Sequence, residues 1–268
     1  MDENPLGKPT EYTETYAPEL LFAVPRKEAR RPLGLSGDLP FQGSDIWNAW
    51  ELTWLDLSGK PQVATATFVV DSSSDNIIES KSLKLYLNSF SMTRFASAAD
   101  ISEKIAIDLS AIATANVDVT IHRDTTAHPI VDFQGQCIDE HEMESVSNEV
   151  DARVLRSDDD RLVSETLYSH LLRSNCPVTN QPDMGSIMIE YVGPKIRATT
   201  LLQYIVSYRQ HSDFHEACVE RIFLDIQKHC NPEDLTVYAR FNRRGGLDIN
   251  PYRTNTAKTP KNLRLWRQ

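Results

Sequence analysis

The chain has 268 residues, of which 40% are apolar and 25% are charged, and its formal net charge is −10. This length allows one large domain or two small ones, and the apolar fraction excludes a disordered or low-complexity chain. The acidic excess argues against non-specific nucleic-acid binding, which depends on cations that neutralise phosphates. No apolar run approaches the roughly 20 residues that span a bilayer, and the first residues lack the pattern of a secretory signal. We therefore expect a cytoplasmic protein that binds no membrane.

Residues 1–45 are predicted to form an irregular N-terminal arm, because six prolines interrupt any periodicity. Regular structure is then expected over 46–136. The β-branched alternation of 62–70 predicts a strand, and the spacing of Ile101, Ile105 and Leu109 predicts one apolar helix face. The predicted elements are strands at 46–57, 62–70 and 83–90, a helix at 98–109, and strands at 116–122 and 129–133.

The segment 137–165 is rich in acidic residues and is predicted to be a linker between two modules. The second module is expected over 166–268. Its predicted elements are strands at 185–192 and 200–208, a helix at 213–229, a strand at 235–241 and further strands near the end.

A weak internal repeat supports duplicated modules. The pattern Leu83-x-x-Tyr86-x-x-Ser89-Phe90 recurs as Leu201-x-x-Tyr204-x-x-Ser207-Tyr208 at an offset of 118, and 107–109 resembles 224–226 at an offset of 117. Each module then has the order strand–strand–helix–strand–strand, which predicts an α+β fold with antiparallel pairing.

The most unusual segment is the polar stretch 174–183, which contains Cys176 and two prolines, Pro177 and Pro182. We expect an exposed thiol there, since such a loop is unsuited to a core strand. An exposed thiolate is a nucleophile, and Asp183 can fold back to exchange protons with the group that the thiol attacks. The alternative is an inert loop cysteine. None of the four cysteines stands in a C-x-x-C pair, so a four-thiolate zinc site is not expected.

Three other segments offer polar groups. Phe214-His215-Glu216 opens the second predicted helix, with Asp213 as a candidate N-cap, and is either a ligand contact or a solvated first turn. Lys81 and Lys84 either hold phosphate or lie on the surface. Arg243-Arg244-Gly245-Gly246 combines cations with glycines that allow close backbone approach, and fits either a nucleotide or a dimer contact. Neither a Rossmann fingerprint nor a P-loop is present.

Together these four segments resemble the 7-cyano-7-deazaguanine reductases, the QueF family of nitrile oxidoreductases. The similar motifs are Glu79 to Tyr86, Ser174 to Gly185, Phe214 to Glu216 and Arg243 to Pro251. The similarity runs from about residue 10 to the end, and the order of the motifs resembles the long, bimodular branch. One departure is Met184, which stands where the family usually has Trp; it puts the placing of Asp183 in question.

The resemblance implies two tandem tunnelling-fold modules, with antiparallel sheets and helices packed on one face. It also implies a homodimer whose sheets assemble into a barrel across subunits. The implied activity is the NADPH-dependent, four-electron reduction of the nitrile of 7-cyano-7-deazaguanine to a primary amine, a step towards queuosine in tRNA.

The resemblance also assigns roles to residues. Cys176 would form a covalent thioimide, Asp183 would supply the proton, and His215 would assist at the imine stage. The substrate would be bound by Ile78, Glu79, Ser80, His215 and Glu216, and NADPH by Ser80, Lys81, Arg244 and Gly245. No metal is expected, and the site would lie between modules or between subunits.

Two other functions remain open at this point. A zinc-dependent pterin or purine enzyme of the GTP cyclohydrolase kind would use Cys176, His215 and Cys218 as ligands, but would leave Asp183 and Lys81 without a role. A non-enzymatic RNA-binding or assembly protein would use the basic C-terminal stretch, against which the acidic net charge weighs.

Overall fold

The computed structural model describes residues 12–124, 128–143, 145, 147 and 149–268. Positions 1–11 of the predicted arm, 125–127 and three positions of the predicted linker lie outside this range. The fold is mixed α+β with antiparallel sheets, and the chain divides into two compact units. Unit 1 contains the described residues up to Ser36, Asp45–Pro129 and Arg243–Ile249. Unit 2 contains Gly37–Ser44, Ile130–Asn242 and Asn250–Gln268.

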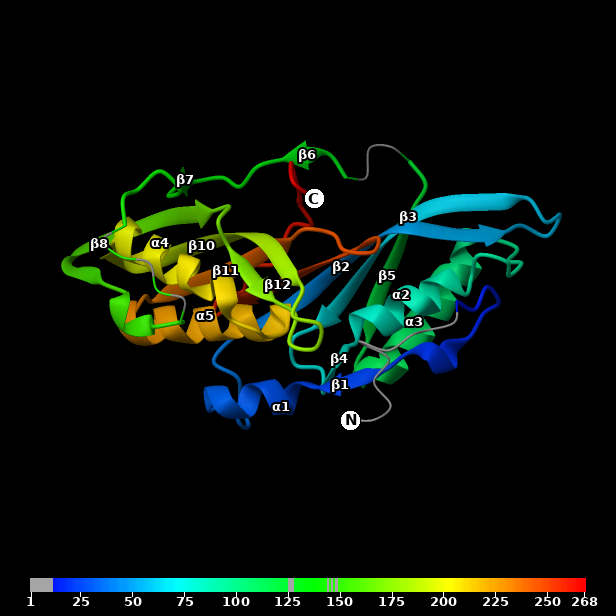
Figure 1. The fold of residues 1–268 in the computed structure, drawn as a ribbon, viewed down its shortest axis with the longest axis horizontal. Coiled ribbons are helices and arrows are strands. Elements are labelled where there is room, and N and C mark those ends of the chain that lie inside the picture. The colour runs from blue at the N-terminus through cyan, green and yellow to red at the C-terminus, as the bar shows by residue number, and fades with distance from the viewer. Residues whose placement is uncertain (1–11, 125–127, 144, 146, 148) are drawn as a thin grey trace. The chain divides into compact units, whose positions relative to one another are not determined.

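Unit 1 pairs three strands in the order β5–β3–β2 and places two helices against them (Figure 1). Its elements are β1 (Ala23–Pro25), α1 (Arg26–Arg30), β2 (Gln42–Leu55), β3 (Pro61–Asp71), β4 (Asn76–Ile78), α2 (Ser80–Asn88), α3 (Ala98–Ala113) and β5 (Val117–His122), with short 3-10 turns at Pro18–Leu20 and Arg31–Leu33. The strands predicted at 46–57 and 62–70 are confirmed as β2 and β3, which pair with each other as a hairpin. Its turn is held by Asp56, whose Oδ1 accepts the backbone N–H groups of Ser58 at 2.9 Å and Lys60 at 3.0 Å.

The core of unit 1 lies between the sheet and the two helices. Alternate residues of β3, Ala66, Phe68 and Val70, are buried, as expected for a strand with one face on the core. The predicted apolar face of α3 is confirmed, since Ile101, Ile105 and Leu109 are fully buried. Burying side chains of this size contributes about 1.5–3 kcal/mol each.

The predicted strand at 83–90 is wrong, because this segment lies in helix α2 and the turn that follows it. The apparent alternation conceals a spacing of three and four: Leu83, Tyr86, Leu87 and Phe90 are all buried on one side. The predicted strand at 200–208 fails for the same reason. It forms α4 (Ala198–Val206) and a 3-10 turn (Ser207–Gln210). Each unit therefore contains a pair of helices. The sequence analysis predicted a strand in place of the first helix of each pair and predicted only the second.

Unit 2 has the strand order β12–β11–β10–β8–β7, with β9 also paired to β10. Its elements are β6 (Ile130–Val131), β7 (Gln136–Cys137), β8 (Ser157–Ser169), β9 (Arg173–Asn175), β10 (Pro182–Ile196), α4, α5 (His215–Cys230), β11 (Asp234–Phe241), β12 (Leu247–Thr254) and β13 (Arg264–Leu265), with a 3-10 turn at Ala152–Val154. Figure 1 shows α4 and α5 beside each other against this sheet. Of the residues described, none belongs to a helix long and apolar enough to cross a membrane.

The end of the predicted acidic linker, 157–165, is not a linker but the first part of β8. Its acidic residues indicated a linker because Asp159 and Asp160 are exposed and Asp158 and Glu165 are partly exposed, on a strand whose partner is β10. Charge here marks a solvent-facing strand. The strand predicted at 129–133 is reduced to the two residues of β6, which pair with β13 in parallel.

The sequence repeat corresponds to one contact that occurs in both units. In unit 1 the Tyr86 hydroxyl of α2 donates to Asp108 Oδ2 of α3 at 2.6 Å. In unit 2 the Tyr204 hydroxyl of α4 donates to Asp225 Oδ2 of α5, also at 2.6 Å. The match at an offset of 118 thus contains the tyrosine, and the match at an offset of 117 contains the aspartate, of a Tyr–Asp hydrogen bond that joins the two helices in each unit.

We expect Tyr204→Phe to destabilise the protein more than Tyr86→Phe. Asp108 keeps a second donor in unit 1, because the Tyr16 hydroxyl also bonds it at 2.6 Å. Tyr204 is fully buried and also bonds the Tyr208 hydroxyl at 2.8 Å, so its loss leaves two groups short of a partner. A hydrogen bond to a charged group contributes roughly 1.5–3 kcal/mol. Urea unfolding of the two variants measures the difference; an equal loss of stability would contradict it.

Candidate functional site

A tight β-hairpin brings Asp183 back towards Cys176. Strands β9 and β10 pair antiparallel, with Asn175 opposite Pro182 and Ser174 opposite Asp183. The Cys176 N–H donates to the Gln181 carbonyl at 2.9 Å, and the Asn180 N–H donates to the Cys176 carbonyl at 3.0 Å. The loop 176–181 is therefore closed by backbone bonds, and the fold-back that the seven-residue spacing predicted is present.

The expectation of an exposed Cys176 is wrong, since this residue is only 5% exposed. The backbone explains why. Asn175 donates its N–H to His211 at 2.8 Å and accepts the Asp213 N–H at 3.1 Å, so the end of β9 is held on a second side. Cys176 starts the loop from this fixed position, while Val178 further along is exposed. The polar composition of the loop therefore did not predict whether the cysteine side chain is exposed or buried.

Asp183 lies against His215. Asp183 Oδ2 is 3.3 Å from His215 Nε2, and both side chains are largely buried. His215 is the first residue of α5, whose N-cap is Phe214, so Asp213 is not the cap that we predicted. Its carboxylate instead accepts the Phe214 N–H at 2.9 Å. A buried carboxylate beside an imidazole can hold and pass a proton.

Met184, which stands next to Asp183, is held by its backbone on both sides, whereas its side chain is 38% exposed. It pairs with Arg173 of β9, and its carbonyl accepts the Asn242 N–H at 2.8 Å. The backbone beside Asp183 is therefore part of the strand ladder.

Glu216 and Cys218 follow His215 in the first turns of α5. Glu216 is buried near the helix N-terminus, where the helix dipole favours a carboxylate. Cys218 is fully buried, and this burial raises the pKa of its thiol well above the usual range. Cys176 and Cys218 are both free thiols. Among the residues described, no group of three His, Cys, Asp or Glu side chains is arranged to hold a metal ion, so the zinc set of Cys176, His215 and Cys218 is not assembled.

The predicted residues of the first motif lie where β4 ends and α2 begins, in unit 1. Ile78 is part of the apolar core. Glu79 is 1% exposed and is the N-cap of α2, with its carboxylate accepting the N–H groups of Lys81 at 2.9 Å and Ser82 at 2.7 Å. Burial raises the pKa of Glu79 in spite of these bonds. Ser80 and Lys81 are half-buried in the first turn.

Arg244-Gly245-Gly246-Leu247 forms a two-residue hairpin turn. Arg244 donates its N–H to Leu247 at 2.8 Å, and the glycines have φ values of 63° and 80°, which only glycine adopts readily. The turn is further held by Trp50, whose N–H donates to the Gly246 carbonyl at 2.9 Å. The glycines thus have a structural role in the turn, which the sequence analysis, with its alternatives of a nucleotide or a dimer contact, did not include.

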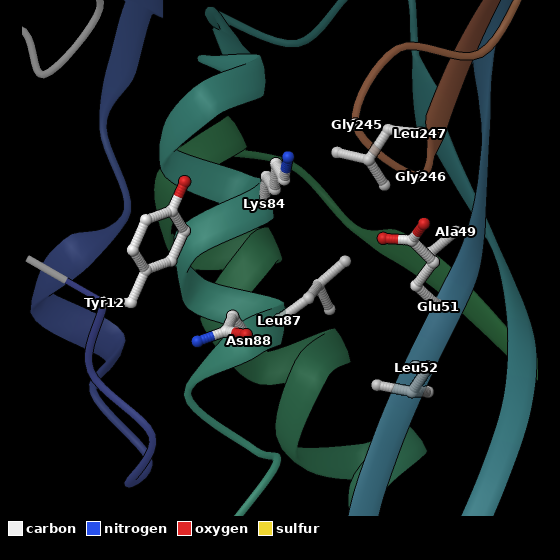
Figure 2. A pocket seen from close by; sticks show the side chains of 10 residues that line it. All are labelled: Tyr12, Ala49, Glu51, Leu52, Lys84, Leu87, Asn88, Gly245, Gly246 and Leu247. Atoms are coloured by element: carbon white, nitrogen blue, oxygen red, sulfur yellow. The ribbon is translucent and has the colours of Figure 1, made fainter. Parts of the chain in front are cut away.

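A small pocket of about 70 Å³ lies beside this turn (Figure 2). The Lys84 ammonium from α2 faces Gly245, and the Glu51 carboxylate from β2 faces Gly246. A Cβ on Gly245 would lie 2.6 Å from Lys84 Nζ, and one on Gly246 would lie 2.5 Å from Glu51 Oε2. Within the described residues Lys84 has no carboxylate within salt-bridge distance. The structure therefore brings together Lys84 and the glycine pair, which the sequence analysis had treated separately.

The predicted residues fall into two groups. Cys176, Asp183, His215 and Glu216 belong to unit 2, where the first two lie in the β9–β10 hairpin and the last two begin α5; Asp183 and His215 are in contact. The others, Ile78, Glu79, Ser80, Lys81, Arg244 and Gly245, belong to unit 1. One neighbour was missed: Phe241, at the end of β11, stacks on the His215 ring. It carries no sequence signal, because the contact depends on the pairing of β10 with β11.

Comparisons with known proteins agree across the whole chain. Residues 12–121 match the family described as nitrile reductase, 7-cyano-7-deazaguanine-reductase N-term, and 182–260 match that described as QueF-like protein. A protein of Paraburkholderia phytofirmans named NADPH-dependent 7-cyano-7-deazaguanine reductase is 51% identical over 100% of this chain and 99% of its own length. One of the same name from Paraburkholderia phymatum is 49% identical with the same coverage.

One solved structure is more distant. The archaeosine synthase QueF-Like in the apo form is 18% identical and matches 36% of this chain and 96% of its own, with a TM-score of 0.31. This likeness carries no argument about the fold.

We predict that Glu79→Ala lowers stability by about 1–2 kcal/mol, since it removes an N-cap that bonds two N–H groups. Ser97→Ala is the matched control, because Ser97 caps α3 through one N–H at 3.2 Å and is exposed. Thermal and urea unfolding measure both. A Glu79→Ala variant as stable as the native protein, or more stable than Ser97→Ala, would show that the capping bonds do not matter.

Proposed function

The chain belongs to the family of NADPH-dependent 7-cyano-7-deazaguanine reductases, and on this basis we propose that it reduces the nitrile of 7-cyano-7-deazaguanine to 7-aminomethyl-7-deazaguanine in queuosine biosynthesis. The observation that supports this proposal most is the closed hairpin, in which Cys176 follows β9 and Asp183 lies on the returning strand, with His215 3.3 Å from the acid. A nucleophile with an adjacent proton relay suits addition to a carbon–nitrogen triple bond.

The first step proposed is attack of the Cys176 sulfur on the nitrile carbon. The S–C bond forms, one C–N π bond breaks, and the nitrogen takes up a proton, which gives a thioimide on the enzyme. The enclosed position of Cys176 protects such an intermediate from water. Two hydride and two proton additions then convert the nitrile to the amine, with the sulfur expelled as the thiol after the first hydride addition.

Asp183 and His215 are proposed to handle the protons. Asp183 lies opposite Ser174 in the same hairpin, two residues from Cys176 along the strand, and would protonate the nitrile nitrogen as the sulfur attacks. His215, in contact with the same carboxylate, would protonate the nitrogen at the imine stage. The 3.3 Å separation supports transfer between the two groups, so one reservoir would serve successive steps.

Substrate recognition is proposed to rest on carboxylates. The N–H groups of a guanine-like edge suit a carboxylate acceptor, and Glu216 is a buried one beside His215 in sequence. Glu79 is proposed as the second, with Ile78 and Ser80 beside it. The capping bonds of Glu79 support a fixed orientation of its carboxylate.

NADPH supplies the hydrides when it is bound. Ser80, Lys81, Arg244 and Gly245 are proposed to hold it. The residues fit an anionic dinucleotide: the Gly245–Gly246 turn leaves room that a Cβ would fill, and Lys84 directs its ammonium to the same place. Cations and exposed backbone at a glycine turn are suited to phosphate. The pocket supports adding Lys84 to the predicted set.

The two compact units are proposed to be tandem tunnelling-fold modules, with the second carrying the nucleophile. The repeated Tyr–Asp contact between paired helices supports a duplication. A homodimer is proposed from the family resemblance, and the net charge of −10 supports a protein that does not bind nucleic acid directly.

Cys176→Ala should abolish covalent capture of the substrate. Intact-mass spectrometry after mixing protein and 7-cyano-7-deazaguanine without NADPH should show a gain of one ligand mass in the native protein, discharged when NADPH is added. Cys218→Ala is the matched control, since it removes another buried free thiol and should keep the adduct. An adduct that persists in Cys176→Ala, or no adduct in the folded, reduced native protein, would refute the proposal.

Lys81→Ala and Lys84→Ala should each raise the KM for NADPH by about tenfold, the loss expected for one charge-assisted phosphate contact. The amplitude of adduct formation without NADPH should stay unchanged. Lys104→Ala is a control on the neighbouring helix α3. Equal losses in nitrile capture and in NADPH use would mean that these lysines are not cofactor contacts.

A further inference from the structure

The ring of Phe241 lies flat against the ring of His215. The centroids are 3.8 Å apart and the planes differ by 8°. Phe241 is fully buried at the end of β11, and His215 is the first residue of α5, so the contact joins the sheet of unit 2 to the start of its helix. None of the roles proposed above includes Phe241.

Glycine at position 185 makes this stack possible. Gly185 pairs with Phe241 across the β10–β11 ladder, two residues after Asp183. A Cβ at Gly185 would lie 3.1 Å from Phe241 Cδ1, which is closer than such contacts normally come. The absence of a side chain at Gly185 therefore leaves space for the Phe241 ring. The same strand, β10, carries Asp183, which His215 contacts.

Backbone bonds fix Phe241 on two sides. Its carbonyl accepts the side-chain amide of Gln268 at 2.9 Å. The next residue, Asn242, donates its N–H to the Met184 carbonyl at 2.8 Å. Met184 itself adjoins Asp183, so the ring and the acid are tied to one short piece of sheet.

The other nitrogen of His215 does not orient the imidazole. Nδ1 is buried, and within the described part of the chain it has no hydrogen-bond partner. Catalytic histidines commonly have their ring plane fixed by a hydrogen bond at the second nitrogen. Here the available contacts are Asp183 at Nε2 and the face of Phe241.

We propose that Phe241 is a positioning residue for the proton relay, and that its ring holds the His215 imidazole in the plane in which Nε2 meets Asp183. This inference rests on the proposed nitrile reduction. A flat apolar surface restricts the imidazole to rotation within its own plane, and the Asp183 contact then selects one orientation. Gly185 serves the same arrangement by leaving the space that the ring occupies.

Phe241→Leu tests the proposal, because it keeps an apolar side chain and removes the flat face. Phe223→Leu is the matched control: Phe223 is also fully buried in unit 2 but packs edge-to-face against Phe41, with centroids 5.4 Å apart. Both variants lose a buried ring, so their stability losses should be similar. The measurements are thermal unfolding, adduct formation with 7-cyano-7-deazaguanine, and NADPH turnover.

We expect Phe241→Leu to form the Cys176 adduct to the native amplitude and to lose about 10- to 100-fold in kcat, the range expected when a general acid is misplaced. Phe223→Leu should keep kcat within about threefold, and Phe241→Tyr, which keeps the ring, should restore most of the loss. Equal kcat in the two leucine variants would overturn the positioning role. Absence of the adduct in the native protein would instead refute the proposed function itself.

A spectroscopic measurement on the native protein is independent of whether the leucine variant folds. A proton over an aromatic face shifts upfield, so the carbon-bound imidazole protons of His215, assigned with His215→Asn, should be displaced from ordinary histidine values. They should return towards those values in Phe241→Leu or, if that variant does not fold, in Phe241→Met. Unshifted resonances in the native protein would overturn the stacked geometry and the proposal.

Discussion

The register of strand β10 is the constraint on which the candidate catalytic group depends. This 15-residue strand pairs with β9 at its start, with β11 from Gly185 onwards and with β8 from Ile187 onwards. The first pairing places Asp183 beside the end of β9, from which Cys176 follows. The second sets Phe241 against Gly185. A slip of one residue would turn every side chain of β10 to the opposite face. Asp183 would then point away from both Cys176 and His215.

The two units share a helix-pair framework and differ in what they attach to it. Each has a Tyr of one helix bonded to an Asp of the next, at the same distance. Each also ends its long helix in a left-handed residue, Thr114 in α3 and Asn231 in α5. The hairpin with Cys176 occurs in unit 2, whereas the capped α2 and the glycine turn occur in unit 1. The two units therefore share a framework and differ in the loops that they attach to it.

Burial of acidic groups accompanies this arrangement. Glu79, Asp183 and Glu216 are all buried, and removing a carboxylate from water costs stability unless polar partners replace the water. Glu79 recovers part of this cost through the N–H groups of α2, yet burial still raises its pKa. Asp183 has the imidazole of His215. The orientation of these carboxylates is therefore set by contacts within the protein.

The sequence by itself determined the family, the α+β class, most strands and the two long helices. Local patterns carry this information: β-branched alternation at 62–70, the i, i+4 face of α3, and motifs whose residue types match a nitrile reductase. It failed at 83–90 and 200–208, where short amphipathic helices imitate alternation, and at 157–165, where charge lay on an exposed strand. Tertiary structure alone decided that Cys176 is enclosed, that Glu79 caps a helix, that Lys84 meets the glycine turn and that Phe241 supports His215. The physical reason is that these contacts join residues far apart in the chain, and strand register and helix packing, which no local pattern encodes, bring them together.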